Sequence, residues 1–144
     1  MTDDNIDFIK MSDKAYEAIT HDVRVSVQPF YLEEESEPEE NRYFWAYQVR
    51  IENLGDATIQ LKTRYWRITD SLGRTEEVRG DGVVGEQPVI EPGFVFEYTS
   101  GAPLGTSSGF MVGYYRMHQK DGKSFDVDIP AFSLDSPYGS HTLN

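Results

Sequence analysis

The chain has no cysteine, no long apolar run and few basic residues, and each absence excludes a class of protein. Without cysteine, its 144 residues form no disulfide, thiolate nucleophile, Cys-ligated zinc site or iron–sulfur cluster. No window approaches the roughly 20 apolar residues that a membrane-spanning helix needs. Residues 1–20 carry five acidic side chains instead of the apolar segment of a signal peptide. We therefore expect a cytoplasmic protein with one domain, large enough to fold around a core of its own.

Negative charge dominates the composition. Thirteen Lys and Arg residues stand against 25 Asp and Glu residues, and the formal net charge is -12. Such a chain repels nucleic acids and anionic membranes, so we expect neither as a partner. Some of the basic residues gather between residues 42 and 79, either as solvated strand faces, which we favour, or as an anion-binding patch. These are Arg42, Arg50, Lys62, Arg64, Arg67, Arg74 and Arg79.

Helical periodicity is almost absent, and apolar residues recur at every second position instead. This alternation over many short segments predicts an all-β fold, an antiparallel β-sandwich with Greek-key connections and an aromatic core, over residues 21–134. The alternating sets are Val23, Val25, Val27; Tyr43, Trp45, Tyr47, Val49, Ile51; Phe94, Phe96, Tyr98; Phe110, Val112, Tyr114; and Phe125, Val127, Ile129.

Three local signals refine the strands. The apolar parity changes between Leu61 and Trp66, which predicts a bulge or a change of sheet. Residues 70–73, reading DSLG, predict a turn, and the Asp121-Gly122 pair predicts a hairpin.

The remaining segments lie outside the alternating pattern. Residues 12–20 have a short helical pattern, with Ser12 as a candidate N-cap, inside an N-terminal arm over residues 1–20 that we expect to be partly disordered. Residues 135–144 are expected to be a loose tail. Residues 33–41 hold six glutamates, which favour a mobile loop over a weak divalent-cation site, so we expect no metal.

One catalytic pattern occurs, but its context argues against it. Residues 105–109 fit G-x-S-x-G around Ser107, yet Ser107 leads directly into a strand, whereas a nucleophile elbow needs a strand-to-helix turn. The histidines share no ligand spacing. We therefore expect no enzyme and no cofactor. The candidate acids are Asp126, Asp128 and Asp135, and the histidines are His21, His118 and His141.

Glycines at 80, 82 and 85 satisfy G-x-G-x-x-G, a spacing used for pyrophosphate binding. A pyrophosphate site needs a helix N-terminus after the last glycine, and Pro88 and Pro92 prevent one. No Lys or Arg occurs from Gly80 to Tyr115, so a phosphate would need Arg74 and Arg79 to fold back towards it. We favour a structural or protein-binding role over anion binding.

Several uncommon runs recur together in the order known from one family. They cover about residues 20–134, and the chain resembles the ApaG family. The resemblance implies a fibronectin type III or immunoglobulin-like sandwich and an interaction role. It also implies an indirect link to cobalt resistance and magnesium efflux, because no span is present to form a channel. The runs include GVVGEQP at 82–88, IEPG at 90–93, YTSG at 98–101, YWRI at 65–68 and GFMVG at 109–113.

The sequence therefore predicts a non-enzymatic protein-interaction module of unknown protein partner. The alternative is a pyrophosphate- or nucleotide-binding protein that uses the Gly80–Gly85 loop. Pairing of exposed sheet edges predicts a homodimer. The candidate binding residues are Trp66, Arg74, Arg79, Gly80, Gly82, Gly85, Glu86, Gln87 and Pro88.

Overall fold

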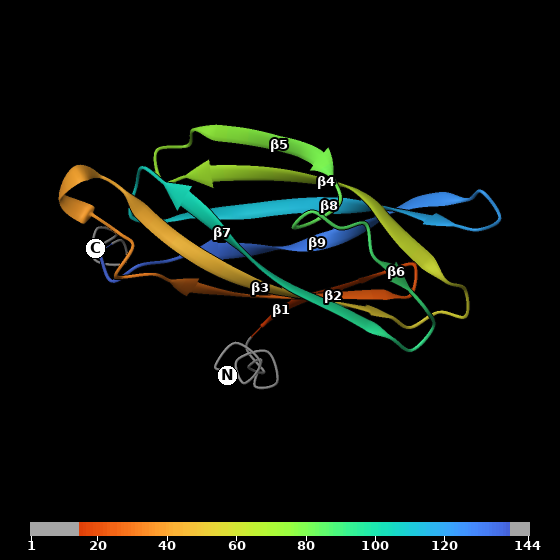
Figure 1. Ribbon diagram of the computed structural model, residues 1–144. Helices are drawn as coiled ribbons and strands as arrows, with labels where there is room; N and C mark the ends of the chain where they lie inside the picture. Colours follow the sequence, from red (N-terminus) through yellow and green to blue (C-terminus); the bar gives the residue numbers. More distant parts are fainter. Residues whose placement is uncertain (1–14, 139–144) are drawn as a thin grey trace.

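The computed structural model describes residues 15–138, which form two antiparallel β-sheets packed face to face (Figure 1). One sheet has the order β1-β2-β3-β7, and the other has the order β5-β4-β8-β9 with β6 paired to β4. The predicted all-β sandwich is thus confirmed. The elements are β1 Tyr16–Thr20, β2 Val23–Tyr31, η1 Pro38–Glu40, β3 Tyr43–Asn53, β4 Ile59–Asp70, β5 Thr75–Asp81, β6 Val89–Ile90, β7 Val95–Leu104, β8 Gly109–Gln119 and β9 Ser124–Leu134.

The core lies between the sheets and is built from alternate residues of each strand. The predicted inward sets of β2 and β3 are confirmed, since every member is buried. Aromatic rings fill much of the space, because side chains of opposite sheets interdigitate there. The largest fully buried side chains are Trp45, Tyr115, Phe132, Ile51, Leu61, Met111, Met117, Ile129 and Leu134.

Strand β8 buries the face opposite to the predicted one. Met111, Tyr115 and Met117 point into the core, whereas Phe110 is 44% exposed and Tyr114 is half-buried on the outside. Both parities of this strand carry apolar residues, so alternation alone gave the wrong face. The outward aromatic residues are consequently available to a partner.

The three local predictions, a bulge, a turn and a hairpin, are confirmed. The register of β4 against β8 shifts between Leu61 and Thr63, which is the predicted bulge. The amide of Gly73 donates to the carbonyl of Asp70 and closes the predicted turn. Gly122 adopts a φ of 91° between β8 and β9, as a tight hairpin requires.

The ends of the described chain are more ordered than predicted. The helix predicted for residues 12–20 is wrong where it can be seen, because Tyr16–Thr20 form β1 along β2, while residues 1–14 lie outside the described part. None of the five residues of this strand is buried, so it carries no core pattern that the sequence could reveal. The first part of the predicted loose tail is anchored: the Trp45 indole donates to the carbonyl of Asp135, and Ser136 is 6% exposed.

The acidic connection between β2 and β3 also has local order. The hydroxyl of Ser36 donates to the carbonyl of Leu32 and accepts from the amide of Phe44. Residues 38–40 then form one turn of 3-10 helix. These bonds give the segment a defined local conformation, and its mobility stays a prediction.

Within residues 15–138, no helix is long and apolar enough to cross a membrane. The outermost strands are β1 and β7 of one sheet and β5 and β9 of the other. β1 and β9 contact each other, and the hydroxyl of Thr20 accepts from the amide of Asp128. The homodimer prediction therefore concerns β5 and β7, and it stays a prediction.

Candidate functional site

The glycine motif forms a tight β-hairpin instead of a phosphate loop. The amide of Val83 donates to the carbonyl of Glu86, and the amide of Glu86 donates back to Val83. The two central residues, Val84 and Gly85, have φ angles of 44° and 81°, and positive φ at both is what a two-residue hairpin turn requires. The second glycine of the motif is also constrained, since a Cβ on Gly82 would lie 2.1 Å from the carbonyl oxygen of Glu86.

Three of the five amides of this hairpin, residues 82–86, are already engaged within the chain. Besides the two that join Val83 and Glu86, the amide of Gly82 donates to the carbonyl of Lys62. A pyrophosphate cradle needs backbone N–H groups that point at the ligand. The geometry therefore gives no support to the pyrophosphate alternative at this loop.

The hairpin instead binds the guanidinium of an arginine on the neighbouring strand. Nη1 of Arg64 donates to the carbonyls of Asp81 and Gly82, each at 2.9 Å. A Cβ on Gly80 would lie 2.8 Å from Nη2 of Arg64, so glycine at this position leaves room for the guanidinium. The sequence placed Arg64 in a basic cluster but gave no sign of this contact, which depends on the pairing of β4 with β5.

The residues after the hairpin attach it to β4. The side-chain amide of Gln87 donates to the carbonyl of Lys62 at 2.9 Å, and Gln60 donates to the carbonyl of Gln87 at 3.0 Å. The carbonyl of Pro88 accepts from the amide of Leu61. Glu86 is exposed at the turn. The structure thus brings the candidate residues from Gly80 to Pro88 together at one edge of the sheet.

Two other candidates lie elsewhere. Arg74 is at the opposite end of β5, where its Nε lies 2.7 Å from Oδ2 of Asp70. Trp66 is 3% exposed in the core and packs edge-on against Tyr47 and Phe132. Neither side chain reaches the surface formed by the hairpin.

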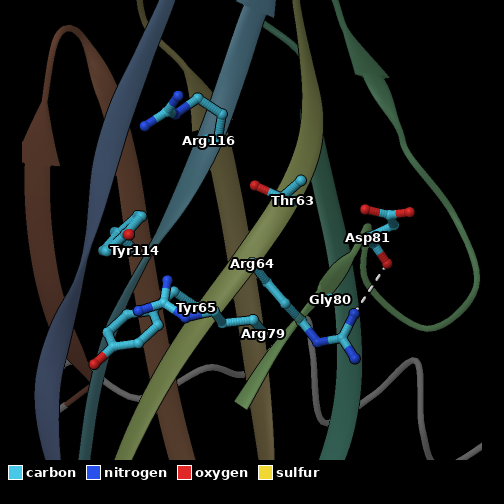
Figure 2. Close-up of a pocket in the computed structure, with 8 residues that line it drawn as sticks. All are labelled: Thr63, Arg64, Tyr65, Arg79, Gly80, Asp81, Tyr114 and Arg116. Atoms are coloured by element: carbon cyan, nitrogen blue, oxygen red, sulfur yellow. Dashed lines mark hydrogen bonds between the residues drawn. The ribbon is translucent and has the colours of Figure 1, made fainter. Parts of the chain in front are cut away.

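A hollow of about 420 Å³ opens beside the hairpin, on the outer face of the sheet (Figure 2). Cross-strand neighbours form two rows there: Arg79, Tyr65 and Tyr114 in one, and Asp81, Thr63 and Arg116 in the other. Figure 2 shows Arg79 over Tyr65 and Arg64 extending the other way, to Asp81. Successive strand residues point to opposite faces of a sheet. The side chains of Thr63 and Tyr65 therefore lie on the outer face, and the Arg64 side chain is directed away from it.

The row of Arg79, Tyr65 and Tyr114 is an aromatic stack capped by a cation. The rings of Tyr65 and Tyr114 lie 5.0 Å apart between centroids at 31°, and Cζ of Arg79 lies 4.4 Å from the Tyr65 centroid. The hydroxyl of Tyr65 donates to Oε2 of Glu77 at 2.6 Å. This hydrogen bond raises the pKa of Tyr65, because the neutral phenol is the donor.

Arg116 has a carboxylate partner on the next strand. Its Nε lies 2.6 Å from Oδ1 of Asp126, and this contact raises the pKa of Arg116. The two side chains are 46% and 43% exposed. An ion pair so exposed contributes little to stability and leaves the guanidinium accessible to a second acceptor. Tyr65, Tyr114 and Arg116 were missed by sequence reasoning, although their outward parity becomes clear once the strands are paired.

The catalytic pattern does not form a site among the described residues. Ser107 lies between β7 and β8, where its backbone carbonyl accepts from the hydroxyl of Ser136. Asp126 lies at the other end of β8, opposite Arg116, and His141 falls outside the described part. His21 packs edge-on against Phe125. Within residues 15–138 no group of His, Asp or Glu is arranged to hold a metal ion.

Comparison with known proteins places this fold in one family. The ApaG domain profile matches residues 33–119. Two proteins named ApaG are similar over 129 residues, 90% of this chain and 99% of theirs: that of Brucella anthropi at 60% identity and that of Rhodospirillum centenum at 61%. A crystal structure of an ApaA protein from Bordetella pertussis superposes with a TM-score of 0.79 at 46% identity, covering 84% of this chain and 98% of that one.

Proposed function

The chain belongs to the ApaG family, and from that premise we propose that it is a non-enzymatic module that binds a protein partner. The docking surface is the outer face of β5, β4 and β8 together with the hairpin at residues 82–86. The observation that carries this proposal is the stack of Arg79, Tyr65 and Tyr114 beside a hollow on a rigid sheet.

The composition of this face supports a protein partner. Tyrosine and arginine are the residue types enriched among those that dominate binding energy at protein interfaces. Their rings are held here by stacking and by the hydrogen bond from Tyr65 to Glu77, so little side-chain freedom is lost on binding. Phe110, 44% exposed on the same face, extends the apolar area.

The hairpin supplies a second, rigid contact next to the stack. Val84 is 52% exposed at its tip, although a β-branched residue at positive φ is strained. Strain of this kind persists where the surrounding structure fixes the backbone, as Arg64 and Gln87 do here. An exposed apolar tip held this way is suited to contact a partner.

Site-specific photo-crosslinking in cells tests the proposal. Benzoylphenylalanine at position 114 should yield a discrete cross-linked product, while the same group at position 44, on the outer face of the other sheet, should not. Arg79→Ser should reduce the product at position 114, because Arg79 belongs to the same surface. Equal products from both positions, or none from position 114, would contradict the proposed surface.

The link to cobalt resistance and magnesium efflux is proposed to act through the same partner. The described residues hold no metal-binding cluster and no membrane-spanning helix, so a direct role in transport has no structural support within them. Cobalt sensitivity of cells that carry Arg79→Ser should then match that of cells lacking the protein. Unchanged sensitivity with a lost cross-link would separate the metal phenotype from this surface.

A further inference from the structure

Resting on the proposed binding function, we propose that the hollow over Thr63 receives an acidic side chain, aspartate or glutamate, from the protein partner. The site is made by Thr63, Arg79 and Arg116. The partner segment is therefore acidic, although this chain itself carries a formal net charge of -12.

The hollow exists because a small residue stands between larger ones. Thr63 pairs with Asp81 on one side and with Arg116 on the other, and the next outward residue of its strand is Tyr65. Strands β5 and β8 are two inter-strand spacings apart, about 10 Å. Long arginine side chains from both strands can therefore reach a group seated over Thr63.

The donors around this position have capacity left for an acceptor. Within residues 15–138, Arg79 takes part in no ion pair, and the Thr63 hydroxyl makes no hydrogen bond. Contact with a ring face uses none of the N–H groups of Arg79 as hydrogen-bond donors, so a carboxylate can accept from them. Arg116 shares its charge with Asp126 in an exposed pair, which a second carboxylate can join.

The acidic residues around the hollow favour binding of a single carboxylate over binding of a doubly charged anion. Asp81 lines the same hollow, and Asp126 lies on the far side of Arg116. A phosphate with two negative charges would face both carboxylates, whereas one carboxylate is matched by the unpaired Arg79. The volume of about 420 Å³ also exceeds what a lone carboxylate fills, so a neighbouring apolar side chain can rest on the Tyr65 and Tyr114 rings.

Amide chemical-shift titration of the ¹⁵N-labelled full chain tests this inference, with acetyl-Leu-Glu-Leu-amide as the probe. Saturable shifts should concentrate at Thr63, Arg79 and Arg116, and acetyl-Leu-Gln-Leu-amide should produce none there. Arg79→Gln should weaken binding about tenfold, the usual effect of losing one charge-assisted hydrogen bond. Arg67→Gln removes the same charge from the same sheet outside the hollow and should change affinity less than about twofold.

A second variant predicts a gain. Asp81→Asn removes the rim carboxylate and should tighten binding of the glutamate peptide, while leaving the folded spectrum unchanged. The inference is overturned if Asp81→Asn has no effect, if Arg79→Gln and Arg67→Gln lose affinity equally, or if the glutamine peptide binds as well. Tighter and better-localised binding of inorganic phosphate would assign the hollow to a small anion and overturn it too.

These outcomes are distinct from failure of the proposed function. A cross-link at position 114 that Arg79→Ser reduces, with no selectivity for the glutamate peptide, would keep the surface and reject the acidic anchor. Loss of the cross-link with selective peptide binding would leave the hollow as an acid-binding site but remove the proposed docking surface.

Discussion

The two outer faces of the sandwich both carry arginines, but the arginines of the two faces have different partners. On the face of β1, β2, β3 and β7, arginines pair with acids of adjacent strands: Arg24 with Glu17 and Glu52, and Arg50 with Glu97. On the face of β5, β4 and β8, Arg79 stacks on a tyrosine and joins no ion pair within residues 15–138. The first face pairs these arginines with acids of its own strands, whereas the second leaves Arg67 and Arg79 without an ion pair among the described residues.

Shape differs between the faces as well. On the first face, Ser26 and Gln48 are 7% and 5% exposed, because neighbouring side chains close over them. On the second, Thr63 lies at the base of a hollow of about 420 Å³ between arginines. Charge left unpaired beside an open hollow is therefore a better sign of a binding face than the number of arginines.

The largest effect should come from a glycine under the binding face. A Cβ on Gly113 would lie 2.0 Å from the carbonyl oxygen of Tyr65, so Gly113→Ala forces β8 away from β4. We expect a loss of about 2 to 4 kcal/mol in the free energy of unfolding, measured in urea. Gly101→Ala in the other sheet, with its nearest atom at 3.5 Å, is the control and should change stability by less than about 1 kcal/mol. Equal effects would remove this difference between the sheets.

The inner faces, by contrast, are joined by a buried pair that should make the fold sensitive to alkali. The hydroxyls of Tyr98 in β7 and Tyr115 in β8 hydrogen-bond each other, and burial raises the pKa of both above the ordinary value of 10.0. The folded state keeps these protons while the unfolded state releases them, so stability is full below about pH 10 and falls as pH rises further.

Each pH unit above the unfolded pKa should remove about 1.4 kcal/mol for each tyrosine kept neutral. Urea unfolding between pH 9 and 11 measures this slope. The double variant Tyr98→Phe/Tyr115→Phe should show a shallower decline, because phenylalanine has no proton to release in the unfolded state. An unchanged slope in that variant would show that other groups set the alkaline limit.

An intermediate effect is expected at the hairpin. Arg64→Met removes both hydrogen bonds to the carbonyls of Asp81 and Gly82 while keeping the apolar part of the side chain. We expect a loss of about 1 to 2 kcal/mol, together with faster amide hydrogen exchange at Val83 and Glu86. Arg67→Met, on the exposed face of the same strand, should alter neither. Protection that persists in Arg64→Met would mean that Gln87 alone fixes the turn.

The smallest effects should come from the exposed ion pairs of both faces. Arg24→Gln and Arg116→Gln each remove contacts to carboxylates on neighbouring strands. Each should cost less than about 1 kcal/mol in thermal unfolding, because solvent screens such pairs. Similar small losses would show that the two faces differ in binding and not in their support of the fold. A large loss on one face alone would refute that view.

The alternating pattern predicted the strands that face a single core and failed where both faces are apolar. β2 and β3 were assigned correctly because most of their outer residues are polar, whereas Phe110 and Tyr114 made the outer side of β8 look like the inner one. β1 was missed because none of its five residues is buried, so it shows no alternating core pattern.

The site was less predictable than the fold because it depends on register. Tyr65, Arg79 and Tyr114 come from three strands, and only the pairing of β5, β4 and β8 brings them into one row. The glycine spacing identified the correct segment. In the structure, the backbone carbonyls of this segment accept hydrogen bonds from the guanidinium of Arg64. The glycine spacing alone does not distinguish that arrangement from backbone amides that surround an anion.

The chain has two tryptophans, and the fold places one indole in each sheet. Both are buried, Trp45 at 1% and Trp66 at 3% exposure, so emission from each should shift to longer wavelength when its own sheet opens to water. Variants that retain a single indole would then give each sheet its own fluorescent reporter. Stopped-flow mixing could in this way time the assembly of the two halves separately, without an added dye.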